Sequence, residues 1–277
     1  MANAPTKPTT PVKKESSSAS GLFATLTIPI CIVVAICIFI FVLGNPSNYA
    51  DGDVEKGLPN FLGTMHRGGN LVPLIMSYLL SVIVFSIERF VVIGKASGTT
   101  SVDVFVRKIQ ALLNASNIDA AAAECDKQKG SVANVIKSGL KKYKEMDEDA
   151  SLDVDQKVLA IQKDIEEATT LEMPMLEQNL NIIATFVSIG TLTGLLGTVF
   201  GMINAFAALA ASGAASQTAL SASISEALVN TALGISTSAI SIVMYNVFTS
   251  KIDKLTYAID ETGFSIVQTF AASHKNK

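Results

Sequence analysis

Hydrophobic residues along the chain gather into four long runs that are separated by polar segments. The runs cover residues 22–43, 71–94, 181–211 and 223–250. Each is long enough for an α-helix to cross a hydrocarbon core of roughly 30 Å, which takes about 20 apolar residues. The pattern therefore predicts an all-α membrane protein with four transmembrane helices. A cleaved secretory signal is the other interpretation of the first run, but its apolar core should be about 7–15 residues long, so an uncleaved helix is favoured.

The segment between the second and third runs, residues 95–180, has the pattern of soluble helices. Eleven Lys or Arg and fifteen Asp or Glu lie between Lys95 and Glu177. Apolar residues recur there at spacings of three and four, which indicates an amphipathic helix: Val154, Val158, Ile161, Ile165, Ala168, Leu171 and Met175. We expect a helical domain, with a kink at Pro174 and a solvated turn in the acidic stretch 145–155.

Positive charges predict how the four helices are oriented in the membrane. The flexible leader 1–21 carries three lysines, the helical domain eleven bases and the tail 251–277 four lysines, whereas segment 44–70 holds only Lys56 and Arg67 and the hairpin 212–222 holds none. We therefore expect both termini and the helical domain in the cytoplasm and the other two segments in the periplasm. At about 1.5 Å per residue the last two helices exceed the bilayer thickness, so we expect them to extend into the cytoplasm.

Composition and residue types argue against catalysis and against nucleic-acid binding. The chain is 49% hydrophobic and 16% charged, with a formal net charge of −3, so no basic surface for nucleic acid is expected. The three cysteines and two histidines lack metal-ligand spacing. We predict no catalytic residues, no cofactor and no metal site. We expect membrane lipids to surround the four helices. Glu88 and Arg89, at the end of the second run, are expected to form a solvated ion pair at the membrane interface.

Glu226 stands alone as a charged residue in the last two helices. Between residues 178 and 250 it is the single Asp, Glu, Lys or Arg. A carboxylate at the bilayer centre costs on the order of 2.5–3.5 kcal/mol on insertion scales, and such residues usually mark an ion or proton route. The alternative is that Glu226, a few residues from the hairpin, reaches the interface or caps the helix. Its position favours the functional interpretation.

Two stripes mark faces of the last two helices. Small residues recur on one arc of the third helix, a pattern that lets another helix approach closely: Gly190, Gly194, Gly197 and Gly201. Polar residues share one arc of the fourth helix: Ser223, Glu226, Asn230, Thr237 and Ser241. The polar stripe, with Asn230 one turn from Glu226, indicates either a hydrated proton path or hydrogen bonds between helices.

Two motifs in these helices resemble those of a known family. Residues 194–202 (Gly-Leu-Leu-Gly-Thr-Val-Phe-Gly-Met) and 224–234 (Ile-Ser-Glu-Ala-Leu-Val-Asn-Thr-Ala-Leu-Gly) are similar to signatures of the MotA/TolQ/ExbB proton-channel family, in particular its ExbB/TolQ branch. The resemblance covers roughly residues 71–250. It implies that Glu226 is the essential pore glutamate and that Thr198 and Thr231 are the two pore-lining threonines.

The sequence departs from the family pattern in three places. Prolines expected near residues 191–193 and near Ile240 are absent, and the helix at 22–43 is additional to the usual three. Thr231 also follows Glu226 by five residues, which is about 140° around a helix. If both side chains line a pore, they must do so from different faces of the helix.

The resemblance implies a subunit of an inner-membrane motor driven by the proton motive force. Such proteins resemble homopentamers that enclose an ExbD/TolR-like single-span partner with a membrane aspartate, and they act on the outer membrane through a TonB- or TolA-like protein. A membrane scaffold with a structural Glu226 and a gliding- or flagellar-type stator are the alternatives. The sequence does not decide whether the chain acts as an ExbB-like or a TolQ-like subunit, or which substrate is moved at the outer membrane. It also leaves open the coupling ion, the stoichiometry with the partner and the role of helix 22–43.

Cysteine accessibility tests the predicted orientation. In a variant without the native cysteines, a cysteine at Asn48 or Ser216 should react with an impermeant thiol reagent added outside the inner membrane. A cysteine at Ser273 should not react, because the positive charges keep the C-terminal end inside. Labelling at Ser273 in intact spheroplasts would reverse the orientation.

Overall fold

The computed structural model describes residues 16–54, 57–212 and 217–274, which form helices with one isolated β-bridge, between Tyr49 and Pro59. Four candidate membrane spans lie within these residues: Thr25–Leu43, Gly69–Ala96, Val154–Ala210 and Ala219–His274. The predicted all-α fold with four helices able to cross a membrane is therefore confirmed. Residues 1–15 of the predicted leader and 213–216 of the predicted hairpin lie outside the described residues.

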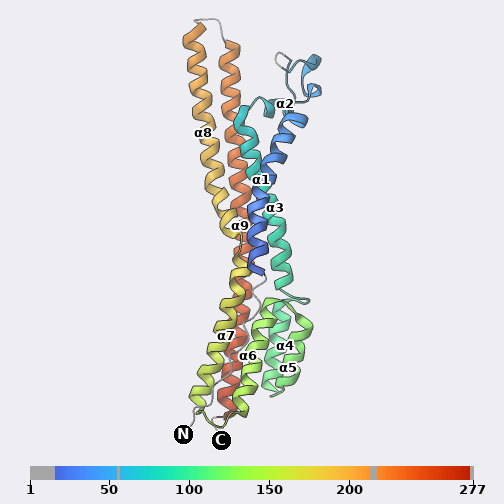
Figure 1. The fold of residues 1–277 in the computed structure, drawn as a ribbon, viewed down its shortest axis with the longest axis vertical. Coiled ribbons are helices and arrows are strands. Elements are labelled where there is room, and N and C mark those ends of the chain that lie inside the picture. Colours follow the sequence, from blue (N-terminus) through green and yellow to red (C-terminus); the bar gives the residue numbers. More distant parts are fainter. Residues whose placement is uncertain (1–15, 55–56, 213–216, 275–277) are drawn as a thin grey trace, which may run out of the picture.

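The membrane helices run side by side along the long axis of the molecule. α1 (Ser16–Cys37) continues as the π-helix η1 (Ile38–Leu43), and α1 packs against α3 (Val72–Ala96). α8 (Leu180–Ser212) pairs with the first half of α9 (Gln217–His274). Figure 1 shows the C-terminal end of α8 and the N-terminal end of α9 at the same end of the molecule as the segment between η1 and α3.

The segment between η1 and α3, residues 44–71, is called here the connecting segment. Its described residues form four short helices: η2 (Pro46–Asn48), η3 (Ala50–Gly52), α2 (Phe61–His66) and η4 (Gly69–Leu71). Asn48, which is 7% exposed, donates hydrogen bonds to the carbonyls of Val42 and Leu43 at the end of η1. A cysteine at this buried position would be shielded from reagent, and Ser216 lies outside the described residues. The exposed Ser47 is therefore the better probe of orientation.

A helical bundle forms the opposite end of the molecule (Figure 1). It consists of α4 (Val102–Asn114), α5 (Ile118–Gln128), α6 (Gly130–Glu148), α7 (Val154–Glu177) and the second half of α9. The segment predicted as a tail is therefore part of a continuous helix up to His274. Apolar side chains continue at helical spacing beyond residue 250 and enter the bundle core, each at most 4% exposed: Ile252, Leu255, Ile259, Ile266 and Phe270.

The apolar stripe of α7 packs into this core only in its first part. Ile161 and Ile165 are buried, whereas Leu171 is 82% and Met175 is 42% exposed. The buried face continues instead to Leu176, eleven residues or about three helical turns after Ile165. Leu171 and Met175 therefore point away from the core. The sequence spacing was compatible with both faces.

Arg89 stabilises the junction between α7 and α8. Pro174, where a kink is expected, lies within α7. The helix ends at Glu177, before Asn179 adopts a left-handed backbone with φ of 62°. Arg89 is 1% exposed, donates from Nη1 to the carbonyls of Met175 (3.1 Å) and Leu176 (3.2 Å), and pairs with Glu88. A cation suits these carbonyls because a helix C-terminus carries partial negative charge. The predicted solvated ion pair was wrong, since Arg89 is buried.

The small-residue ridge of α8 lies against α9 of the same chain. A Cβ atom at Gly197 would lie 2.4 Å from Cβ of Asn230, and one at Gly201 would lie 2.7 Å from Cβ of Ala227. Gly194 faces Gly234, where a Cβ atom would lie 2.7 Å from the Gly194 Cα. A Cβ atom at Gly190 would lie 2.9 Å from the Ser238 hydroxyl oxygen, and this hydroxyl donates to the Val187 carbonyl at 2.7 Å and accepts from Thr191. The two backbones are thus in direct contact over the length of the ridge.

Gly197→Ala should weaken the packing of α8 on α9, because the new methyl group would overlap Asn230. Overpacking of this kind costs about 1–3 kcal/mol, and we expect a lower thermal unfolding midpoint in detergent. Gly94→Ala in α3 is the matched control, since a Cβ atom there meets nothing within 4 Å. Equal midpoints for the two variants would contradict the close contact.

Arg89→Met should lower the free energy of unfolding by about 3–5 kcal/mol, because it leaves a carboxylate and two helix carbonyls without their buried partner. The change is measured by denaturant unfolding followed by circular dichroism. Arg107→Met, at an exposed position on α4, should change the free energy little. Similar losses in both variants would show that the buried contacts of Arg89 contribute nothing specific.

Candidate functional site around Glu226

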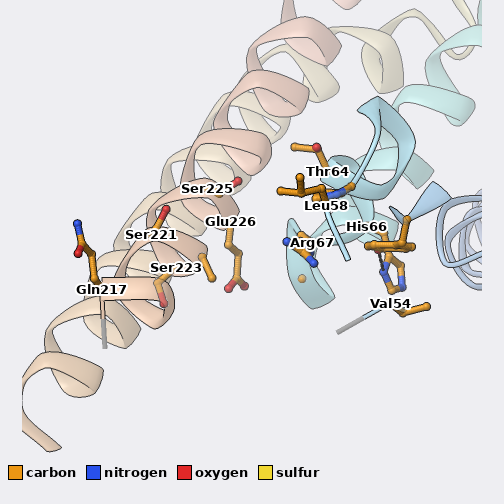
Figure 2. A pocket seen from close by; sticks show the side chains of 14 residues that line it. Val54, Leu58, Thr64, His66, Arg67, Gln217, Ser221, Ser223, Ser225 and Glu226 are labelled. Atoms are coloured by element: carbon orange, nitrogen blue, oxygen red, sulfur yellow. Dashed lines mark hydrogen bonds between the residues drawn. The ribbon is translucent and has the colours of Figure 1, made fainter. Parts of the chain in front are cut away.

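Glu226 lies near the start of α9 and borders a pocket of about 1250 Å³ between α9 and the connecting segment. Figure 2 shows its side chain projecting from α9 on the side of the connecting segment, which contributes Thr64, His66 and Arg67 to the same pocket. The α9 wall is largely polar and carries Gln217, Ser221, Ser223 and Ser225. The structure thus opens Glu226 to a cavity with a polar α9 wall.

The connecting segment touches Glu226 through a turn of two glycines. A Cβ atom at Gly69 would lie 2.2 Å from Oε1 of Glu226, so the carboxylate rests against the Gly69 backbone. Gly69 has a φ of 77°, in the left-handed region that favours glycine. Asn230 donates from Nδ2 to the Gly68 carbonyl at 2.8 Å. Glu226 and Asn230 therefore face the same turn of the connecting segment.

The other wall of the pocket carries an aromatic and basic cluster. The Tyr49 hydroxyl and the His66 Nδ1 are 2.8 Å apart, and the Arg67 guanidinium lies 5.5 Å from the Tyr49 ring centroid. Arg67 also donates to the Gly57 carbonyl at 2.7 Å. Burial lowers the pKa of His66 and raises that of Tyr49, against an opposing effect of Arg67. Both side chains are therefore neutral near pH 7, and Arg67 brings positive charge to this wall.

The two threonines singled out by the sequence lie on other faces. Thr231 donates to the Gly194 carbonyl at 3.2 Å and so faces α8. Thr198 is half-buried on α8, and its hydroxyl donates to the Leu195 carbonyl at 2.6 Å. The structure brings Asn230, but neither threonine, to the connecting segment beside Glu226. The 140° between Glu226 and Thr231 thus separates two different helix contacts.

The polar stripe of α9 is closed beyond Asn230 within this chain. Asn230, Thr237 and Ser241 are fully buried. The hydroxyls of Thr237 and Ser241 donate to the Leu233 and Thr237 carbonyls of their own helix, at 2.9 and 2.7 Å. These two hydroxyls therefore form neither an open path nor bonds between helices inside one chain. The Glu226 end of the stripe is the part that meets the pocket.

Sequence reasoning missed the wall that faces Glu226. Tyr49, His66 and Arg67 are ordinary residues of a polar loop, and their sequence positions do not indicate that the loop folds back onto α9. The adjacent glycines Gly68 and Gly69, immediately before an apolar run, were the available signal, because such a pair indicates a tight turn or a close approach of the backbone.

Known proteins are similar to this chain over the helices that carry the site. A family model described as the MotA/TolQ/ExbB proton channel family matches residues 127–261. The Tol-Pal system protein TolQ of Pseudomonas aeruginosa is 24% identical over 182 residues, which cover 64% of this chain and 79% of TolQ. A putative biopolymer transport protein ExbB-like 3 of Synechocystis is 34% identical over 88 residues, covering 31% of this chain and 42% of that protein.

The biopolymer transport protein ExbB of Xanthomonas campestris pv. campestris is 30% identical over 102 residues, covering 37% of this chain and 40% of that ExbB. The two proteins named ExbB are thus matched over about two fifths of their length, and TolQ over most of it. The family match includes both motifs of α8 and α9, with Thr198, Glu226, Asn230 and Thr231. These matches support the assignment of the chain to the MotA/TolQ/ExbB proton channel family, in its ExbB/TolQ branch.

Proposed function

We propose that this chain is the proton-channel subunit of an ExbB/TolQ-like inner-membrane motor that uses the proton motive force to drive work on the outer membrane. The observation that carries the proposal is the setting of Glu226. Its carboxylate borders a pocket with several polar side chains and has no hydrogen-bond partner among the described residues. A carboxylate that held helices together would do so through a hydrogen bond or an ion pair, so the arrangement favours a proton carrier over a scaffold.

Proton binding at Glu226 changes the charge of an otherwise uncharged pair of helices. The membrane potential supplies roughly 2.3 kcal/mol per elementary charge per 100 mV. Coupling free energies between sites in proteins are typically about 1–3 kcal/mol. One proton per Glu226 is therefore enough to shift an equilibrium between two arrangements of a helix contact. On the family resemblance we assign Thr198, which is half-buried on α8, and Thr231 to the wall of the pore.

Exposed apolar side chains support assembly of several copies. On α8 and α9 they would meet lipid or a neighbouring subunit. In the charged helical bundle four large ones are more than 60% exposed, at Leu159, Leu171, Tyr257 and Phe264. A contiguous apolar patch outside the membrane usually marks an interface. We assign these surfaces to contacts in a homo-oligomer, which on the family resemblance is a pentamer.

A partner is needed to turn proton binding into directed work. Identical copies in a symmetric ring carry equivalent Glu226 sites, so the ring alone has no order of events. We propose an ExbD/TolR-like single-span partner with a membrane aspartate, and a TonB- or TolA-like protein that reaches the outer membrane. The relatives include a Tol-Pal system protein and biopolymer transport proteins, so the work is envelope maintenance or outer-membrane transport. Both termini are assigned to the cytoplasm, and the Glu226 pocket to the periplasmic side.

Proton flux in liposomes tests the proposal. Under an imposed gradient the purified chain should give little flux, and adding the single-span partner should give coupled flux. Glu226→Gln should abolish that flux, because Gln keeps the shape of the side chain but cannot ionise. Insertion and oligomeric state should be unchanged.

Asp260→Asn, an exposed position on the same helix, is the control and should keep full flux. Near-normal flux in Glu226→Gln would exclude Glu226 as the proton carrier. Fast flux from the chain without a partner, lost in Glu226→Gln, would indicate a self-sufficient channel in place of a motor subunit.

A further inference from the structure

Two glycines of the connecting segment contact α9 at three residues of one helix face. Asn230 donates to the Gly68 carbonyl at 2.8 Å. A Cβ atom at Gly68 would lie 2.6 Å from Cγ1 of Val229, so that backbone is also in contact with α9. At Gly69 the corresponding atom would lie 2.2 Å from the Glu226 carboxylate oxygen. One turn of the connecting segment thus covers one side of the Glu226 carboxyl group.

This turn is also held from its other side, so α9 does not set its position alone. His66 and Tyr49 are joined by a 2.8 Å hydrogen bond, and the His66 ring lies 4.7 Å from that of Phe39 in η1. Asn60 donates to Asn48 at 3.2 Å and accepts from the Gly63 N–H at 3.0 Å. The two glycines therefore come from a folded unit that presents its backbone to Glu226.

We propose that the Gly68–Gly69 turn, fixed by Asn230, positions the Glu226 carboxyl group and forms the wall of the entrance through which it exchanges protons. Asn230 then acts as a positioning residue that holds the connecting segment, in place of a proton carrier. The proposal rests on the proposed role of Glu226 and adds the element that controls access to it.

The geometry supports one direction of access within the chain. The stripe beyond Asn230 is buried, and its Thr237 and Ser241 hydroxyls are bonded to their own helix. The Gly69 backbone covers one side of the carboxylate, where even a methyl group would not fit. The remaining side is the pocket, lined by Ser221, Ser225 and Arg67. Water in this pocket would reach Glu226 without crossing the apolar part of α9.

The test is the rate at which a water-soluble carbodiimide and an added amine convert the Glu226 carboxyl group to an amide in the full chain in liposomes. Peptide mass spectrometry measures this rate without any motor activity. Gly69→Ala places a methyl group where the carboxylate lies, so the carboxylate or the turn must move toward the pocket. We expect modification about tenfold faster, which corresponds to an opening easier by about 1.4 kcal/mol. Asn230→Ala, which releases Gly68, should act in the same direction.

Gly52→Ala is the matched control for backbone strain. Gly52 has a φ of 71°, close to that of Gly69, but a Cβ atom there meets nothing within 4 Å. In this variant the Glu226 carboxyl group should be modified at the same rate as in the unaltered chain. Equal rates in Gly69→Ala and Gly52→Ala would overturn the proposal, because the contact between Gly69 and Glu226 would then have no effect of its own.

Flux with the partner separates this proposal from the proposed function. Gly69→Ala should reduce flux about tenfold when Glu226 is present and have no further effect when combined with Glu226→Asp, whose shorter side chain leaves room for the methyl group. An equal loss in both backgrounds would overturn the positioning role while leaving the proton role of Glu226 intact. Absence of flux in the unaltered chain, with the modification rates as expected, would instead contradict the proton role alone.

Discussion

The direct contact between the backbones of α8 and α9 is the constraint on which the rest of the site depends. Gly194 and Gly234 leave no side chain between the helices, so their rotation about their own axes is fixed. That rotation turns Thr231 toward α8 and Glu226 toward the connecting segment. It also turns the large apolar side chains outward, toward lipid or a neighbouring subunit. A lone carboxylate can then face the pocket beside the connecting segment while the helix pair remains compatible with the membrane.

Arg89 connects this helix pair to the charged bundle. The unfavourable desolvation of its buried guanidinium is offset by two carbonyls at the end of α7 and by the Glu88 carboxylate, which surround it. The contact lies where α7 ends and the left-handed Asn179 redirects the chain into α8. α9 continues from the membrane helices into the bundle without a break. The membrane helices and the bundle are thus joined by one continuous helix and one interrupted helix.

The sequence predicted the features that depend on local periodicity. Four apolar runs, a small-residue ridge and an isolated carboxylate follow from spacing and composition. Spacing gives the face of a helix but not its partner, so the sequence could not assign the ridge to α9 of the same chain. Arg89 was misjudged because the carbonyls that surround it come from residues more than eighty positions away. The wall opposite Glu226 was missed for the same reason, since it depends on how a polar loop folds.

The additional first helix is linked to Glu226 through the connecting segment. Leu43 at the end of η1 is buried in one cluster with Val72 and Ile75 of α3 and Leu233 of α9. The Phe39 ring lies 4.7 Å from that of His66, and Asn48 donates hydrogen bonds to the last two carbonyls of η1. The end of the first helix therefore supports the segment whose glycines meet Glu226. The first helix and the covered carboxylate therefore form one structural unit.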